Sequence, residues 1–326
     1  MLQTGRRLTE LTGSGGSMGH APFLSVVICT RDRAASLERT LESLVAAAQR
    51  MARPWELVVV DNGSSDETPQ VIASFADRLP VRGVREDAAG LSNARNAGVK
   101  QAQGEYIVWT DDDVVVDPGW LEGWAGGIEQ AQDCAVFGGR ALPVFEEPVQ
   151  DWFVSNERHL QSLLAVRDSR EWTEVDVNHV PFGLNFAVRA VEQRAHPYDP
   201  ELGVGPGRRL GGEEVAVIRA ILREGGRGRW VWDALVRHMI PASRQSAAYI
   251  RRFYKAIGYG YPIGGKRQAA PLRAWGALLA GVVWATSRLR LGRFDESGEP
   301  ADVRALVRLG LAEGSLRQHL GRPLDD

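Results

Sequence analysis

Short apolar runs alternate along residues 21–139 with segments in which apolar residues recur every three or four positions. The runs are rich in β-branched, leucine and aromatic residues, and they lie at Phe23–Cys29, Leu57–Val60, Val81–Val84 and Tyr106–Trp109. Nearly continuous runs of this kind are typical of parallel strands that are buried on both faces. The pattern therefore predicts an α/β domain with a mostly parallel central sheet flanked by helices.

Helices are expected between these strands, including one over Asp66–Leu79 and one over Ser92–Gln101. Serine is a favoured N-cap residue, so we expect Ser92 to cap the second of them. Asp66 and Asp117 are also interpreted as caps, because each is followed by a proline near the start of a helical segment.

Polar residues follow three of the predicted strands. The first run is followed by Thr30 and Asp32, the second by Asp61, and the fourth by the triplet Asp111–Asp113. Ligands of open α/β sheets bind at the carboxyl ends of the strands, where such residues would meet. We therefore expect a ligand site at this edge of the sheet.

The Asp triplet needs a separate explanation. Three adjacent carboxylates repel one another unless a cation is present. In an extended segment side chains alternate, so Asp111 and Asp113 would face one way and Asp112 the other. Two oxygen ligands on one side suit Mg²⁺ or Mn²⁺, and a solvated acidic turn is the alternative that the triplet alone leaves open.

Charge and length narrow the class of protein. The 326 residues include 39 Lys and Arg against 41 Asp and Glu, for a formal net charge of −2, which argues against a general nucleic-acid-binding protein. The two cysteines, Cys29 and Cys134, are expected to be free thiols. No apolar stretch reaches the roughly 20 residues that span a bilayer, so a cytoplasmic protein is expected.

Several motifs together resemble those of the family 2 glycosyltransferases, which have the GT-A (nucleotide-diphospho-sugar transferase) fold. In the order and spacing of that family, they are Ser25–Arg33, Val58–Asp66, Gly90–Gly98, Asp111–Asp113, Gly183–Arg189 and Leu210–Glu214. The resemblance covers about residues 22–260. It implies a nucleotide-sugar donor, a UDP-sugar by our interpretation, and inversion at the anomeric carbon.

The resemblance also implies roles in binding the nucleotide. Asp61 matches the position that contacts the base, with Thr30 and Asp32 on the neighbouring strand end. Arg95 matches the basic residue of the Ala-Arg-Asn motif near the nucleotide. Asp111 and Asp112 belong to the same nucleotide-binding group.

The triplet matches the DxD motif of the family, which implies a Mn²⁺ or Mg²⁺ site. Asp113 and Asp111 are the expected ligands, and His238 matches a histidine that can approach the metal or the diphosphate. A purely structural histidine remains the alternative. On the acceptor side we expect Asn185 and Trp120.

Glu213 and Glu214 are the candidates for the general base. They precede a helical pattern, and the positive end of a helix dipole favours ionised carboxylates in the first turn. Glu214 matches the position where the family carries its catalytic aspartate, so the chain departs from the family by one methylene group. We expect Glu214 to act as the base, with Glu213 as the other candidate.

The predicted organisation is a flexible leader over 1–20, a catalytic domain over 21–265 and a helical tail over 266–326. The catalytic domain divides into a nucleotide-binding half (21–115) and an acceptor half (116–265). The predicted function is a metal-dependent inverting glycosyltransferase that acts on a hydroxyl of a glycan or lipid-linked acceptor in the assembly of a cell-surface polysaccharide. A non-catalytic sugar-nucleotide-binding or scaffold protein of the same fold is the second hypothesis.

The C-terminal region leaves one question open. Tyr249, Phe253 and Ile257 would share a helix face, and Ala274–Ser287 is a run of 14 uncharged residues followed by arginines. These features suit either a peripheral patch at the inner face of the membrane or a helical tail packed on the catalytic domain.

Overall fold

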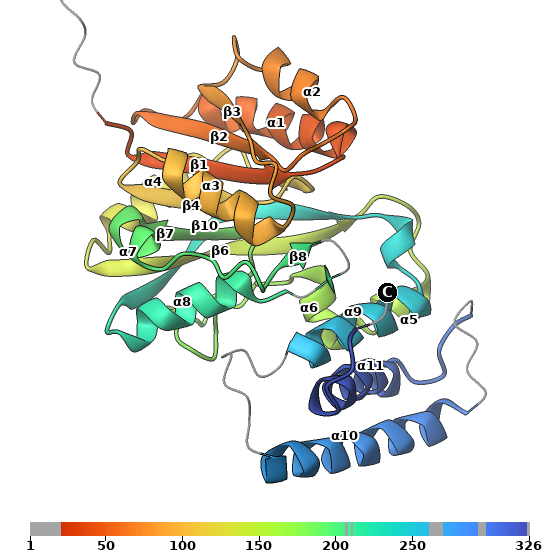
Figure 1. The fold of residues 1–326 in the computed structure, drawn as a ribbon. Coiled ribbons are helices and arrows are strands. Elements are labelled where there is room, and N and C mark those ends of the chain that lie inside the picture. The colour runs from red at the N-terminus through yellow and green to blue at the C-terminus, as the bar shows by residue number, and fades with distance from the viewer. Residues whose placement is uncertain (1–20, 206–207, 210, 261–269, 293–297, 325–326) are drawn as a thin grey trace, which may run out of the picture.

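The computed structural model describes residues 21–205, 208–209, 211–260, 270–292 and 298–324. The predicted leader lies outside these residues, and so does the boundary at 265–266. In the described part of the chain a single sheet of eight strands forms the centre of the fold, in the order β3-β2-β1-β4-β7-β6-β10-β5 (Figure 1). Two further short strands, β8 and β9, pair with each other.

Four of the strands, β1 to β4, lie close to the predicted positions. The strand bounds are β1 Leu24–Thr30, β2 Trp55–Asp61, β3 Val81–Arg85, β4 Tyr106–Thr110, β5 Val114–Val116, β6 Cys134–Phe145, β7 Asn185–Arg189, β8 Val204–Gly205, β9 Arg208–Arg209 and β10 Arg227–Ile240. Strands β1 to β4 are mutually parallel, and β7 is antiparallel to both β4 and β6. The prediction of a mostly parallel sheet is confirmed.

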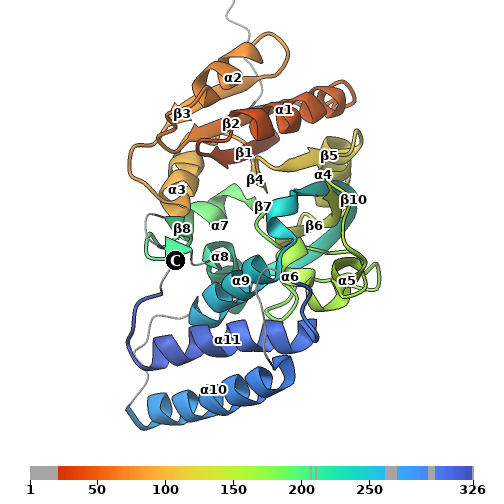
Figure 2. The ribbon, with the colours of Figure 1, turned by 90° about the vertical axis from the view of Figure 1, so that its right-hand side faces the viewer.

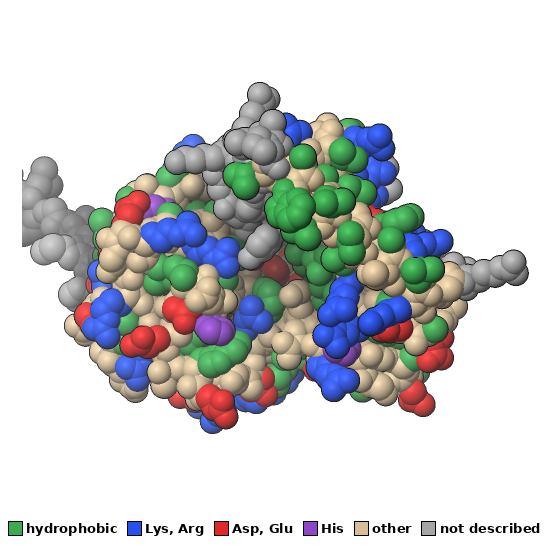
Figure 3. All heavy atoms as spheres, turned by 90° about the horizontal axis from the view of Figure 1, so that it is seen from below, with side chains coloured by type: hydrophobic (Ala, Val, Ile, Leu, Met, Phe, Trp, Pro, Cys, Tyr) green, Lys and Arg blue, Asp and Glu red, His purple; other side chains and the backbone are tan. Residues whose placement is uncertain are grey.

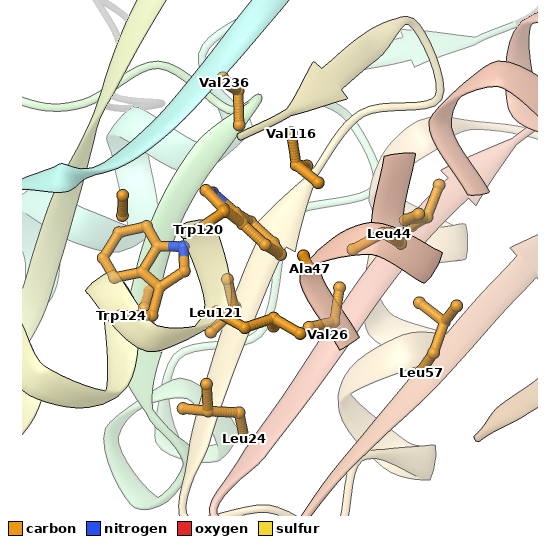
Figure 4. Packing of buried hydrophobic residues seen from close by; sticks show 14 of the residues in the cluster. Leu24, Val26, Leu44, Ala47, Leu57, Val116, Trp120, Leu121, Trp124 and Val236 are labelled. Atoms are coloured by element: carbon orange, nitrogen blue, oxygen red, sulfur yellow. The ribbon is translucent and has the colours of Figure 1, made fainter. Parts of the chain in front are cut away.

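Helices cover both faces of this sheet. Their bounds are α1 Ala34–Ala48, α2 Thr68–Ser74, α3 Leu91–Gln101, α4 Trp120–Glu129, α5 Asp151–Val154, η1 Glu157–His159, α6 Gln161–Leu164, α7 Ala190–Ala195, α8 Glu213–Arg223, η2 Ala242–Arg244, α9 Ala247–Gly260, α10 Ala270–Leu291 and α11 Val303–His319. Along β1, Val26 and Ile28 join the core under α1 and α4, whereas Val27 joins the core under α3 and α8. Figure 4 shows the first of these cores, in which the rings of Trp120 and Trp124 pack edge to face.

Three helix starts differ from the sequence prediction. Ser92 lies inside α3, where its hydroxyl donates to the carbonyl of Leu202, and the N-cap is Gly90 at φ 127°. The helix predicted over Asp66–Leu79 is limited to α2, and Asp66 accepts hydrogen bonds from the backbone N–H of Thr68 and of Ala34. Helix α4 begins three residues after Asp117, because Asp117 accepts from Gly119 in the turn before it.

The three C-terminal helices form a layer below the sheet. Helix α9 packs on α11, and α11 packs on α10, so α10 is the outermost of the three (Figures 1 and 2). The predicted aromatic face of α9 does not reach the surface as a membrane patch: Tyr249, Phe253 and Ile257 pack, partly buried, against a third hydrophobic core that includes α11. The helical tail is confirmed. The two cysteines are free, as expected.

Glycines allow α9 and α11 to approach closely. A Cβ on Gly314 would lie 1.9 Å from the carbonyl oxygen of Lys255, and a Cβ on Gly258 would lie 2.1 Å from that of Leu311. Both neighbours are backbone atoms, which cannot move aside without separating the helices. The crossing therefore requires residues that have no side chain at these positions.

We expect Gly314→Ala to destabilise the protein by about 1–3 kcal/mol, because the added methyl group forces the two helices apart. Gly281→Ala is the matched control, since a Cβ at Gly281 in α10 would meet nothing within 4 Å. There the higher helix propensity of alanine should be neutral or stabilising by up to about 1 kcal/mol. Thermal or urea unfolding of the two variants measures the difference, and equal midpoints would contradict the close crossing.

Candidate active site

The carboxyl ends of β1, β2 and β4 bring the predicted nucleotide-binding residues together. In the parallel register Thr30 at the end of β1 lies opposite Asp61 at the end of β2. The hydroxyl of Thr30 donates to Asp112 Oδ2 at 2.6 Å, which joins β1 to the turn after β4. Asp61 is buried and accepts from the Ser64 N–H at 2.8 Å, with Arg85 Nη1 at 3.3 Å from its other oxygen.

Asp32 lies in the loop after β1, in a left-handed conformation at φ 51°. Its Oδ1 accepts from the backbone N–H of Ser65 at 2.7 Å and from the Ser65 hydroxyl at 3.0 Å. These hydrogen bonds hold the pKa of Asp32 below its usual value. The loops that follow β1 and β2 are thereby fixed to each other through an ionised carboxylate.

The Asp triplet is a turn rather than an extended segment, so the predicted alternation of its side chains is wrong. Asp112 Oδ1 lies 3.1 Å from Arg33 Nε, and Asp113 Oδ2 lies 3.0 Å from Arg33 Nη2. Asp111 lies on the other side, 4.0 Å from Arg95 Nη2. Burial raises the pKa of Asp112 to about 7, although Arg33 opposes the shift.

Two arginines and a histidine surround Asp113. Besides Arg33, it contacts Arg244 Nη2 at 2.9 Å, and His238 Nε2 lies 3.7 Å away. Burial alone would raise the pKa of Asp113, but His238, Arg33 and Arg244 outweigh it and hold the pKa well below its ordinary value. Asp113 is therefore an ionised carboxylate in a buried site.

The chemistry of this group fits a divalent cation. The backbone carbonyl of Leu164 accepts from His238 Nδ1 at 3.1 Å, which leaves the lone pair of Nε2 directed away from that bond, as in metal-binding histidines. Carboxylate oxygens bind Mg²⁺ and Mn²⁺, and the neutral imidazole is the commonest metal ligand among side chains. Arg244 donates hydrogen bonds to both Asp113 and His238. Its guanidinium therefore supplies positive charge beside these two side chains and would compete with a metal cation for them.

Asp111 does not join Asp113 in a ready-made set of ligands. Among the described residues, no group of three or more His, Cys, Asp and Glu side chains is arranged to hold a metal ion. The protein therefore offers Asp113 and His238. Divalent cations in phosphate-transfer sites commonly take their other ligands from water and substrate phosphates.

Arg95 of α3 links the triplet to the start of α8. Its guanidinium is buried among Trp109, Phe186 and Tyr198, with ring centroids 5.4, 5.7 and 5.4 Å from Cζ. Its Nη2 lies 3.6 Å from Glu213 Oε1, and its Nη1 has no hydrogen-bond partner in the described part of the protein. A buried cation with an unused donor is suited to bind an anionic ligand group.

Glu213 and Glu214 differ in their surroundings. Glu213 is buried at the first position of α8, after Gly212 at φ 98°. Burial and the neighbouring Glu214 raise the pKa of Glu213 to about 7, against the effect of Arg95. Glu214 is half-buried, and a Cβ on Gly183 would lie 3.5 Å from Glu214 Oε1 and 2.6 Å from Arg95 Nη2. Gly183 therefore leaves room for both side chains.

The two residues expected on the acceptor side lie in the core instead. Trp120 is fully buried, and its indole N–H donates to Asn185 Oδ1 at 3.0 Å. The amide of Asn185 donates to the carbonyls of Arg140 and Ala234, both at 2.8 Å. Every polar group of this pair is satisfied within the protein, so neither residue is available to an acceptor.

Sequence reasoning missed two arginines of the site. Arg33 comes directly after the polar residues that end β1, and this position in the sequence could have indicated that it belongs to the site. Arg244 lies in η2, more than one hundred residues after the triplet, and no sequence pattern marks it. Both were missed because only the fold brings them to Asp113.

Residues 25–186 match the model of the family "Glycosyl transferase family 2". The chain is 37% identical over 109 residues to validoxylamine A glucosyltransferase of Streptomyces hygroscopicus subsp. jinggangensis, and the aligned segment covers 33% of this chain and 26% of that protein. It is 30% identical over 146 residues to hyaluronan synthase of Pasteurella multocida, and this segment covers 44% of this chain and 15% of that protein. The match thus spans about a quarter or less of these curated relatives.

Two solved structures share the fold over most of the chain. Mannosyltransferase PcManGT from Pyrobaculum calidifontis, in complex with GDP-Man and Mn²⁺, gives a TM-score of 0.58 at 17% identity, over 92% of this chain and 88% of that chain. S. aureus TarS 1–349, in complex with UDP-GlcNAc, gives a TM-score of 0.53 at 15% identity, over 92% of each chain. The chain therefore belongs to family 2 of the glycosyltransferases and has the GT-A fold.

Proposed function

We propose that this protein transfers a sugar from a nucleotide-sugar donor to a hydroxyl group of a glycan or lipid-linked acceptor, with inversion at the anomeric carbon. The observation that carries the proposal is the position of Arg95, which lies 4.0 Å from Asp111 and 3.6 Å from Glu213. This supports a single site, because Arg95 links the predicted nucleotide-binding edge to the start of α8, which carries both candidate bases. A role in assembling a cell-surface polysaccharide belongs to the same proposal.

The donor is a sugar nucleotide, and we favour a UDP-sugar. Asp61 and Asp32 would bind the nucleoside, since their carboxylates lie at the ends of neighbouring parallel strands. The related structures were solved with UDP-GlcNAc and with GDP-Man, so the fold itself accommodates either base. The Nη1 atom of Arg95 would donate to the donor diphosphate.

A divalent cation, Mn²⁺ or Mg²⁺, would be held by Asp113 and His238. When bound, it stabilises negative charge on the leaving diphosphate as a Lewis acid. Arg33 and Arg244 carry positive charge to the same place, since both contact Asp113. The protein therefore concentrates positive charge where the leaving group gathers negative charge.

Glu214 acts as the general base in this proposal. Its side chain is half-exposed, whereas Glu213 is buried and engaged with Arg95, so an acceptor hydroxyl would reach Glu214 first. As the anomeric bond to the diphosphate breaks through an oxocarbenium-like transition state, Glu214 accepts the proton of the attacking hydroxyl. Glu213 is a positioning residue that orients Arg95.

The proposal is tested by incubating the protein with Mn²⁺ or Mg²⁺, a panel of UDP- and GDP-sugars, and glycan or lipid-linked acceptors. A glycosylated product together with stoichiometric release of nucleotide supports transfer. The alternative is a non-catalytic sugar-nucleotide-binding protein. The one feature that supports it is the glutamate at the position of the base, where the family usually carries an aspartate. Saturable donor binding with no product for any acceptor would favour that alternative.

We expect Asp61→Ala to weaken binding of the nucleotide by about tenfold or more, or about 1.4 kcal/mol, because it removes a buried acceptor at the nucleoside position. Isothermal titration with UDP and GDP measures the change in Kd. The control is Asp77→Ala, an exposed aspartate in the turn after α2. A folded Asp61→Ala variant with unchanged Kd would remove Asp61 from the site.

A further inference from the structure

Large apolar side chains line the outward face of α10. Six of them are between 54% and 82% exposed, and we call them the outer row: Leu272, Trp275, Leu278, Leu279, Val282 and Leu289. Exposed apolar residues scattered singly are ordinary on a soluble protein, but a contiguous row with a tryptophan marks an interaction surface. The face that carries the row is not covered by another element in the described part of the chain.

The inward face of the same helix carries small residues. Ala280 and Ser287 are buried, and a Cβ on Gly276 would lie 2.4 Å from the ring of His319 in α11. A helix that served only to cover a core would turn its large apolar residues inward. In α10, Leu291 is the one large apolar residue that is buried among those whose side chains are described, so the outer row is not explained by packing within the chain.

The region around α10 is strongly basic. Residues 247–294, from the start of α9 to just after α10, contain nine Lys and Arg and no Asp or Glu, although acidic residues outnumber basic ones in the whole chain. Arg273, Arg288 and Arg290 belong to α10 itself. Seen from below, hydrophobic side chains gather beside Lys and Arg side chains on the face of the molecule where α10 lies (Figure 3).

This combination matches an anionic lipid surface. Helices that lie in the membrane interface present leucine and tryptophan to the acyl boundary and basic residues to the lipid phosphates. A second copy of the chain would bring two basic surfaces together, which like-charge repulsion disfavours. No helix among the described residues is long and apolar enough to cross a bilayer, so the contact would be made along the helix surface.

We propose that α10 binds the surface of an anionic bilayer, with the outer row inserted at the boundary between headgroups and acyl chains. Arg288 and Arg290 then contact lipid phosphates from the edges of the row. This contact does not depend on the transfer reaction, and it holds whichever acceptor the protein uses. It places the basic C-terminal layer, rather than the aromatic face of α9, against the membrane.

The test is co-sedimentation of the full chain with vesicles of phosphatidylcholine alone or mixed with phosphatidylglycerol. We expect binding to the mixed vesicles, weakening with added salt, and about tenfold less bound protein for the double variant Trp275→Ser with Leu279→Ser. The control double variant, Val154→Ser with Val191→Ser, removes two exposed valines from α5 and α7 and should bind as the unmodified protein does. Circular dichroism checks that each variant is folded.

Arg288→Gln combined with Arg290→Gln tests the contribution of charge. This variant should lose most of its preference for phosphatidylglycerol while its fold is retained. Absence of binding to mixed vesicles, or equal binding by the folded outer-row variant, would overturn the proposal. A dimer in light scattering that the outer-row variant abolishes, without lipid binding by the unmodified chain, would assign the row to self-association instead.

Discussion

We expect Glu214→Gln to lower the rate of sugar transfer by about 10²- to 10⁴-fold, the contribution of a positioned general base. The amide cannot accept the proton of the acceptor hydroxyl, but it keeps the size of the side chain. Donor binding should stay nearly unchanged, because Glu213 rather than Glu214 lies 3.6 Å from Arg95. Turnover with saturating donor gives kcat, and titration calorimetry gives the Kd of the nucleotide.

Two further variants distinguish the glutamates. Glu214→Asp keeps a carboxylate of the type that the family usually carries at this position, so it should retain measurable transfer. Glu213→Gln removes the charge that pairs with buried Arg95, so it should weaken donor binding as well as slow the reaction. The opposite result would be near-normal turnover in Glu214→Gln, together with loss of turnover but intact donor binding in Glu213→Gln. It would assign the role of general base to Glu213 instead of Glu214.

The strands of the sheet could be predicted because the pattern of apolar residues that marks each strand lies within a few consecutive positions. Val26 and Ile28 point to one face of β1 and Val27 to the other, and both faces are buried. Such a strand must read as a continuous apolar run, and the polar residues that end it mark the ligand edge. For the same reason Thr30 and Asp61 could be placed at one edge before their register was known.

The details of the site depend on long-range contacts that no local pattern carries. Arg244 reaches Asp113 across the fold, and Trp120 is paired with Asn185 in the core rather than facing an acceptor. The triplet was read as extended because period-two alternation applies only within a strand, and β4 ends at Thr110. The outward orientation of α10 also could not be read from its sequence, since apolar residues occur on both of its faces.

Asp113→Asn should reduce transfer by about 100-fold or more and weaken the dependence on Mn²⁺, because a cation at a leaving diphosphate contributes several kcal/mol. Asparagine keeps the shape of the side chain but removes the negative charge that opposes Arg33 and Arg244. Titrating Mn²⁺ against both donor binding and turnover separates the loss of metal affinity from a loss of fold.

Asp117→Asn is the matched control for this variant, since Asp117 follows β5 and pairs with Arg237 at 3.3 Å but does not contact the site. It should leave the Mn²⁺ titration unchanged. Transfer by the unmodified protein that survives removal of divalent cations would show that Arg33 and Arg244 alone supply the positive charge. In that case Asp113→Asn would still slow transfer, because Asp113 holds both arginines, but the loss would not vary with Mn²⁺. The shape of the Mn²⁺ titration, rather than the loss of activity, therefore decides whether Asp113 binds a metal or orients two arginines.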